Sequence, residues 1–329
     1  MDMDGKILRA GAAAIVLAVF LRLFSGSGAA QKIRDVSQSD IASFLLFLQT
    51  GKVVRQVPFR EAEEPEPTVP IQPQPETREP VAFDEADAAN IQIANRDQWD
   101  VDIQALLTQP LSWDLMDQEG PTVLILHTHA SESYLPTGEY EESSSYRTLD
   151  EGYNVISVGD RLAEILEDGG IWVLHDRTLH DYPSYNGSYE NSRKTLQAYM
   201  AEYPTIRLVL DIHRDAMEDT SGNQIGYTVS TERGTSAKLM LVVGTDTGGL
   251  HHPNWEENLA VALKLHALLE RENSGICRPV SLRTSRFNQD LCAGAVLAEV
   301  GAAGNSRQEA LIAAEYLAET ILRLSAGSP

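Results

Sequence analysis

The sequence predicts an α/β fold built on an open, mostly parallel, twisted sheet with helices on both faces. Two observations predict it. From Gly120 onward, short apolar runs rich in β-branched residues alternate with longer amphipathic segments. The runs are also nearly continuous in apolar residues, which is typical of parallel strands buried on both faces. Such a sheet binds its ligands beyond the carboxyl ends of its strands.

The individual elements follow from the same patterns. Residues 156–168 place apolar side chains on one helical face before a Gly-Gly stop, and Ser306 with Glu309 forms a capping-box pattern. The segments 224–231 and 238–245 are predicted to pair as strands joined through residues 232–237. The remaining strands are expected at 121–129, 171–176, 206–216 and 295–301, and the remaining helices at 192–204, 255–273 and 306–324.

The first third of the chain has a different character. Residues 7–24 are predominantly apolar and long enough to span a bilayer if Arg9 and Arg22 reach the interfaces, although a cleaved signal peptide is the alternative. Residues 61–80 hold six of the fifteen prolines and many glutamates, which predicts a disordered linker. We therefore expect a tail at 1–6, a transmembrane anchor at 7–24, a stalk at 25–119 and a catalytic domain at 120–325.

Charge and cysteine content exclude some functions. A net charge of −22 repels phosphate backbones, so nucleic acid is not an expected partner. Cys277 and Cys292 lack the spacing of a thiolate zinc site. The sequence leaves open whether they form a disulfide or remain two separate thiols.

Ionisable residues follow several of the predicted strands. His127 and His129 end the first, His213 ends the third, and Glu299 lies near the end of the last. Because parallel strands share one carboxyl edge, we expect these side chains to converge. Two imidazoles and one carboxylate are the protein ligands of a catalytic zinc ion whose fourth position is left for water.

The third zinc ligand is less clear from the residues alone. Glu132 lies three positions after His129, so a turn there would direct both side chains the same way, but an acid capping a helix is an equal alternative. His127 would share a face with His129 on an extended chain, as an alternate ligand or as a hydrogen-bond partner of the ligand. Asp215 either orients the site or pairs with Arg214.

Five motifs resemble the stage II sporulation protein P family, in the same order between Thr122 and Gly304. Phe287 replaces a tyrosine of that family, and Cys292-Ala293 replaces its usual Ser-Pro. The motifs are HTHASESY (127–134), HDYPSYNGSY (180–189), DIHRDA (211–216), HPNWEENLA (252–260) and FNQDLCAGAVLAEVG (287–301).

The resemblance implies an amidase_3-like fold, similar to zinc-dependent N-acetylmuramoyl-L-alanine amidases. It assigns the zinc ligands to His129 and His213 and the catalytic glutamate to Glu299. The carboxylate ligand of that wider group precedes the first helix, at Asp150 or Glu151 here, whereas we take Glu132 as the third ligand. Substrate contacts are expected from His180, Tyr185 and Asn288.

The expected function is that of a membrane-tethered, extracytoplasmic peptidoglycan hydrolase that uses Zn²⁺. By the resemblance it would cleave the amide between N-acetylmuramic acid and L-alanine, with some action on peptide cross-links. It would act at the septum during engulfment in sporulation, beside a glycan hydrolase like stage II sporulation protein D. The alternatives are a metal-dependent amidohydrolase acting on other substrates and a non-catalytic wall-binding scaffold.

Overall fold

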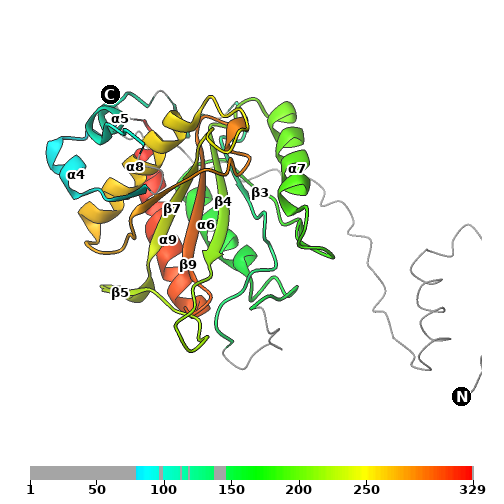
Figure 1. The fold of residues 1–329 in the computed structure, drawn as a ribbon. Coiled ribbons are helices and arrows are strands. Elements are labelled where there is room, and N and C mark those ends of the chain that lie inside the picture. The colour runs from blue at the N-terminus through cyan, green and yellow to red at the C-terminus, as the bar shows by residue number, and fades with distance from the viewer. Residues whose placement is uncertain (1–78, 96–98, 112, 118, 137–145, 328–329) are drawn as a thin grey trace, which may run out of the picture. The chain divides into compact units, whose positions relative to one another are not determined.

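The computed structural model describes residues 79–95, 99–111, 113–117, 119–136 and 146–327, which belong to one compact unit (Figure 1). The expected anchor at 7–24 and almost all of the expected linker at 61–80 lie outside these ranges. Among the described residues, no helix has the length and apolar content needed to cross a membrane.

A seven-stranded sheet forms the centre of the unit, in the order β1-β8-β7-β9-β4-β2-β3. All neighbours are parallel except β7 and β9, which are antiparallel, so the sheet is mixed but mostly parallel as predicted. Its strands are β1 (Ile93–Asn95), β2 (Val123–Leu126), β3 (Val173–His175), β4 (Leu208–Asp215), β7 (Leu239–Gly244), β8 (Val280–Arg283) and β9 (Ala295–Ala302).

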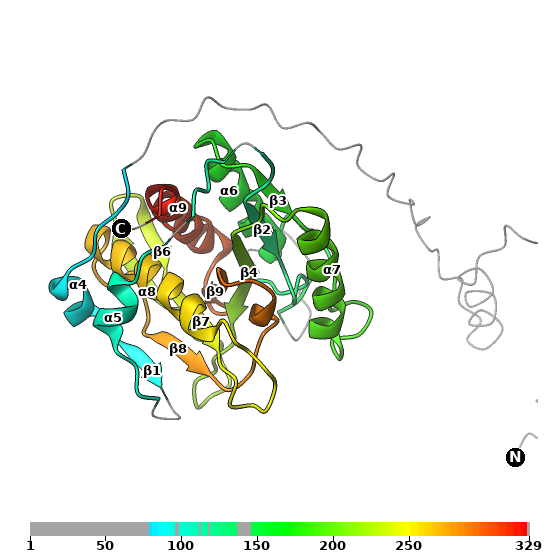
Figure 2. The same ribbon diagram turned by 90° about the horizontal axis from the view of Figure 1, so that it is seen from above.

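Helices cover both faces of this sheet, which confirms the predicted architecture (Figure 2). In β2, Val123 and Ile125 join the core with α6, α8 and α9, whereas Leu124 and Leu126 pack with Leu196 of α7 on the other face. The helices are α4 (Glu85–Asn90), α5 (Ile103–Thr108), α6 (Val155–Asp168), α7 (Ser188–Glu202), α8 (Trp255–Glu272), α9 (Arg307–Leu324) and the 3-10 turn η2 (Gln289–Leu291).

Two helix starts test the capping arguments. In α9, Ser306 accepts from the Glu309 amide while Glu309 accepts from the Ser306 amide, so the predicted capping box is present. Helix α7 begins at Ser188 after the left-handed Gly187, one turn before the predicted start at Ser192. Ser192 lies inside the helix, where its hydroxyl contacts that of Thr128 instead of capping the helix.

The predicted hairpin of 224–231 with 238–245 is wrong in its pairing. The strand β5 (Thr228–Thr231) instead pairs with β6 (Gly234–Ala237) in a separate two-stranded sheet. β7 then joins the main sheet beside β9, where all six of its residues are buried. Burial of this strongly apolar segment outweighs the local hairpin pairing that the sequence pattern suggested.

Part of the expected stalk is packed into the same unit. β1 pairs with β8, and Leu107 and Leu115 are fully buried in the main core. The buried ammonium of Lys264 on α8 donates to the carbonyl of Leu107. The folded unit therefore begins well before the expected boundary at Gly120. Cys277 and Cys292 are separate free thiols.

Candidate functional site

The central strands bring the predicted site residues together. β4 and β9 are neighbours, and His213 stands directly opposite Glu299 in their register. β2 lies on the other side of β4 and ends at Leu126, so the turn that carries His129 and Glu132 leaves the sheet beside His213. His129, His213 and Glu299 therefore converge as expected from parallel topology, whereas His127 does not.

His129 is buried on the face of the sheet that α7 covers. Its ring stacks on Tyr185 at a centroid distance of 4.4 Å, and its centroid lies 5.4 Å from that of Tyr189 and 5.3 Å from that of His213. Burial lowers the pKa of His129 to about 4, although Glu132 opposes the shift. The ring is therefore neutral near pH 7, and its Nδ1 has no hydrogen-bond partner among the described residues.

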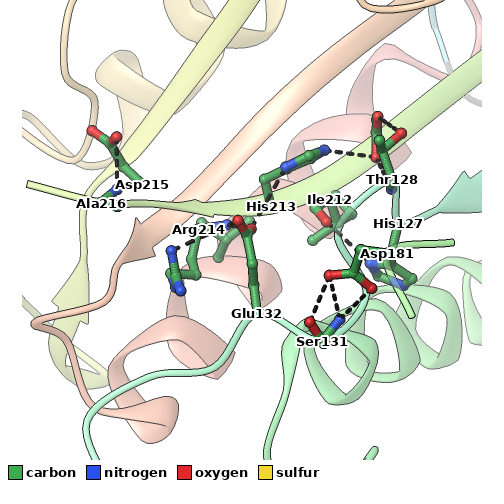
Figure 3. Close-up of polar contacts among 12 residues, drawn as sticks. His127, Thr128, Ser131, Glu132, Asp181, Ile212, His213, Arg214, Asp215 and Ala216 are labelled. Carbon is green, nitrogen blue, oxygen red and sulfur yellow. Dashed lines mark hydrogen bonds and ion pairs between the residues drawn. The ribbon is translucent and has the colours of Figure 1, made fainter. Parts of the chain in front are cut away.

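Glu132 points from its turn toward β4, between His213 and Arg214 (Figure 3). Its amide donates to the His129 carbonyl at 3.0 Å, so the turn predicted from their spacing exists. Oε2 accepts from the Arg214 amide at 3.2 Å, and Oε1 lies 3.3 Å from Arg147 Nη2. Burial raises the pKa of Glu132, but His213 and the charge of Arg214 outweigh it and leave the pKa at about 2.

His213 lies between two carboxylates. Nδ1 is 3.6 Å from Glu132 Oε2, and Nε2 is 2.9 Å from Asp211 Oδ1. The second contact has ion-pair distance, yet its N–H direction misses the line of a hydrogen bond. Burial lowers the pKa of His213, but the two carboxylates outweigh this effect and hold the pKa well above its usual value.

Glu299 is the most isolated acid of the group. Its Oε2 is buried without a hydrogen-bond partner among the described residues, and Arg286, a candidate partner by sequence, pairs with Asp290. Burial raises the pKa of Glu299 to about 8, although His213 opposes the shift. A carboxyl group with this pKa can hold or release a proton near neutral pH.

His127 lies apart from this group, on the face covered by α6. Its Nδ1 donates to the Ile212 carbonyl at 3.1 Å, and its Nε2 lies 2.8 Å from His175 Nε2. A Cβ on Gly159 of α6 would come within 2.7 Å of His127 Nε2, so the helix packs directly on the ring. The chain turns immediately after β2, which separates His127 from His129 despite their spacing of two.

Two other acids that the sequence suggested for the site form ion pairs with arginines instead. Glu151 lies 2.7 Å from Arg177, and Asp215 lies 2.7 Å from Arg278. Figure 3 shows the Asp215 side chain directed away from Glu132 and His213.

The three expected substrate contacts differ in exposure. His180 is buried, with Nε2 3.0 Å from Asp176, and Asn288 donates to the Tyr189 carbonyl at 2.8 Å. Tyr185 is 54% exposed and covers His129, so it alone of the three presents a large surface to solvent beside the site.

Sequence reasoning missed Asp211 and Arg147. Asp211 shares the strand face of His213, and this alternation in DIHRDA was the available signal. Arg147 joins the site through Glu132 and Asp181 from a distant loop, where no local pattern marks it. In the described part of the chain, no three His, Cys, Asp or Glu side chains stand at metal-ligand spacing.

These features define an α/β protein with a cluster of histidines and acids at the carboxyl edge of its sheet. The sequence matches the profile of stage II sporulation protein P over residues 32–322. The chain therefore belongs to the stage II sporulation protein P family, as the motifs indicated.

A curated relative is the stage II sporulation protein P of Bacillus subtilis (strain 168), 32% identical over 211 residues. The match covers 60% of this chain and 49%, about half, of the length of that relative. Similar solved structures include two N-acetylmuramoyl-L-alanine amidases. The one from Nostoc punctiforme is 17% identical, and the match covers 62% of this chain and 97% of that chain with a TM-score of 0.36. The one from Clostridium difficile 630 is 16% identical, and the match covers 63% of this chain and 95% of that chain with a TM-score of 0.37.

Proposed function

We propose that this protein is a zinc-dependent peptidoglycan hydrolase that cleaves the amide between N-acetylmuramic acid and L-alanine. The observation that carries the proposal is the convergence of His129, Glu132, His213 and Glu299 from three distant segments at one sheet edge. Membership of a sporulation family supports a cell-wall substrate.

The residues fit zinc by their chemistry. A neutral imidazole, a second imidazole and an ionised carboxylate are the ligand types of a catalytic zinc site, supplied here by His129, His213 and Glu132. The unpartnered Nδ1 of His129 and Oε2 of Glu299 are buried polar atoms that a bound ion and its water would satisfy.

Each residue then has a defined task. Zinc would polarise the scissile carbonyl and lower the pKa of bound water to about 7. Glu299 would accept the proton of the attacking water and deliver it to the leaving amine. A cation beside Glu299 would lower its pKa from about 8 and ionise it near neutrality. Tyr185 would pack against the sugar or peptide at the entrance.

The cellular setting is also part of the proposal. The apolar segment at 7–24 would anchor the chain as a single pass, and the Pro-rich linker would let the domain reach the wall of the septum between forespore and mother cell. Its partners would be peptidoglycan, a glycan hydrolase like stage II sporulation protein D and membrane proteins of engulfment. Peptide cross-links would be a secondary substrate.

The two alternatives are less well supported. A barrel-type amidohydrolase needs a closed sheet, whereas the sheet described here ends at β1 and β3. A wall-binding scaffold has no need for a glutamate whose Oε2 is enclosed without a hydrogen-bond partner, as that of Glu299 is among the described residues.

The test combines metal content with product analysis. The purified full chain is loaded with zinc, incubated with cell wall, and compared with a His213→Ala variant. We expect about one zinc per chain, together with products that carry a new L-alanine amino terminus, and loss of both in the variant. A His213→Ala protein that keeps its zinc would show that the metal site is misassigned.

A further inference from the structure

Asp211 is a buried carboxylate on β4, two residues before His213 and on the same face. Its contacts in the described structure have short distances. Oδ1 accepts from the Thr128 amide at 2.8 Å, Oδ2 accepts from the Thr128 hydroxyl at 2.6 Å, and Oδ1 lies 2.9 Å from His213 Nε2. These contacts join the end of β2 to β4, the two segments that carry His129 and His213.

A chain of donors supports this carboxylate from behind. Thr128 Oγ1 also lies 2.8 Å from Ser192 Oγ on α7. Because a carboxylate only accepts, the single hydroxyl proton of Thr128 goes to Asp211, and Ser192 donates to Thr128. Asn288 in turn donates to Ser192 Oγ at 3.2 Å. Asn288, expected to contact substrate, thus adds a fourth segment to this chain of contacts.

His213 thus has one carboxylate at each ring nitrogen, and the two carboxylates are not equivalent. The Asp211 contacts measure 2.6–2.9 Å, whereas the Glu132 contacts to Arg214, Arg147 and His213 measure 3.2–3.7 Å. Glu132 also follows His129 in the same turn. By these distances Asp211 is the more tightly hydrogen-bonded carboxylate, and Glu132 is the one more readily available to bind an ion.

We propose that Asp211 is the positioning residue of the metal site: it accepts the Nε2 proton of His213 and leaves Nδ1, on the Glu132 side, to bind the metal. This rests on the proposed zinc function. A metal-binding imidazole usually donates its other N–H to a carboxylate or carbonyl, which fixes its tautomer and orientation. Rotation of the His213 ring about χ2, a broad torsion, would align Nε2–H with Oδ1.

The test measures metal binding by the full chain. Asp211→Asn should still bind about one metal per chain, with affinity lower by about 10- to 100-fold in competition with a chelator. The absorption spectrum of the cobalt-loaded form should also shift, because the ligand field of His213 changes. Thr128→Val, which leaves the carboxylate in place but removes a donor, should weaken zinc binding by a smaller factor.

Asp176→Asn is the matched control. Asp176 is also buried beside a histidine, with Oδ2 3.0 Å from His180 Nε2, but it does not contact His129 or His213. We expect wild-type zinc affinity and an unchanged cobalt spectrum for this variant. Thermal unfolding of each metal-free variant separates lost metal affinity from lost folding.

Several outcomes would overturn the assignment. Wild-type zinc affinity with an unchanged cobalt spectrum in Asp211→Asn would remove the role, as would unchanged affinity in Thr128→Val if Asp211→Asn does not fold. Loss of the metal in Asp211→Asn with its retention in Glu132→Gln would make Asp211 the ligand. Failure of the wild-type chain to bind zinc would instead contradict the proposed function.

Discussion

At the scale of single residues, burial determines what each acid and base of the site can do. Glu132 is buried and Glu299 is partly buried with its Oε2 enclosed, yet their pKa values move in opposite directions, to about 2 and about 8. Glu132 has His213 and Arg214 beside it, whereas the Oε2 of Glu299 has no partner among the described residues. The low pKa keeps Glu132 ionised, as a metal ligand must be, whereas Glu299 can exchange a proton near neutral pH.

Glu299→Gln should abolish turnover while leaving zinc bound. Glutamine keeps the shape of the side chain but cannot accept the proton of water, so we expect a loss of turnover on the order of a hundredfold or more. Product release from purified cell wall and metal analysis measure the two properties. Near-normal turnover in the zinc-loaded variant would eliminate Glu299 as the base.

The same substitution should change how stability depends on pH in the metal-free protein. Glu299 binds its proton more tightly when folded, because burial raises its pKa from 4.5 to about 8. The wild type should therefore lose stability as pH rises from about 4.5 to about 8, and the loss should level off above that range.

Glu299→Gln removes this titration. The free energies of unfolding of the two proteins should therefore diverge across that pH range by at most about 5 kcal/mol, at about 1.4 kcal/mol per pKa unit. Urea unfolding with a chelator present, at several pH values, measures the difference. Parallel stability profiles would mean that Glu299 is not buried and unpaired in solution.

At the scale of elements, the segment before Gly120 is part of the core. Arg271 of α8 pairs with the buried Asp87 of α4, Lys264 donates to Leu107 of α5, and β1 extends the sheet beside β8. The sequence suggested a stalk here because these elements are three to six residues long, too short to show a clear hydrophobic period.

A fragment that starts at Gly120 should accordingly be less stable than one that starts at Glu79. It loses the fully buried Leu107 and Leu115, each worth about 2–5 kcal/mol by analogy with truncation to alanine, and it exposes one side of α8. Thermal unfolding of the two fragments, 79–329 and 120–329, gives the comparison. Equal midpoints would show that residues 79–119 pack only weakly.

At the scale of the whole molecule, the chain combines a folded α/β unit with an N-terminal region of very different composition. Residues 7–24 are predominantly apolar, whereas residues 61–80 are acidic and rich in proline. We propose that the first anchors the protein and the second spaces the folded unit from the membrane.

The full chain should therefore fractionate with membranes and require detergent for release. Deletion of residues 1–24 should move it to the soluble fraction, because no other apolar run of similar length occurs in the sequence. N-terminal sequencing of the expressed protein provides the control. A mature form that starts near Gln31 in the soluble fraction would identify a cleaved signal peptide instead.

The sequence by itself determined the α/β class, most of the helices and strands of the sheet, the family, and the convergence of His129, His213 and Glu299 at its edge. These depend on local hydrophobic period and on the rule that parallel strands share a carboxyl edge. The tertiary structure alone decided that His127 and His129 lie on opposite faces of the sheet, because a turn after Leu126 interrupts the alternation of the strand. It also decided the contacts of Asp211 and Arg147, which join residues far apart in the chain.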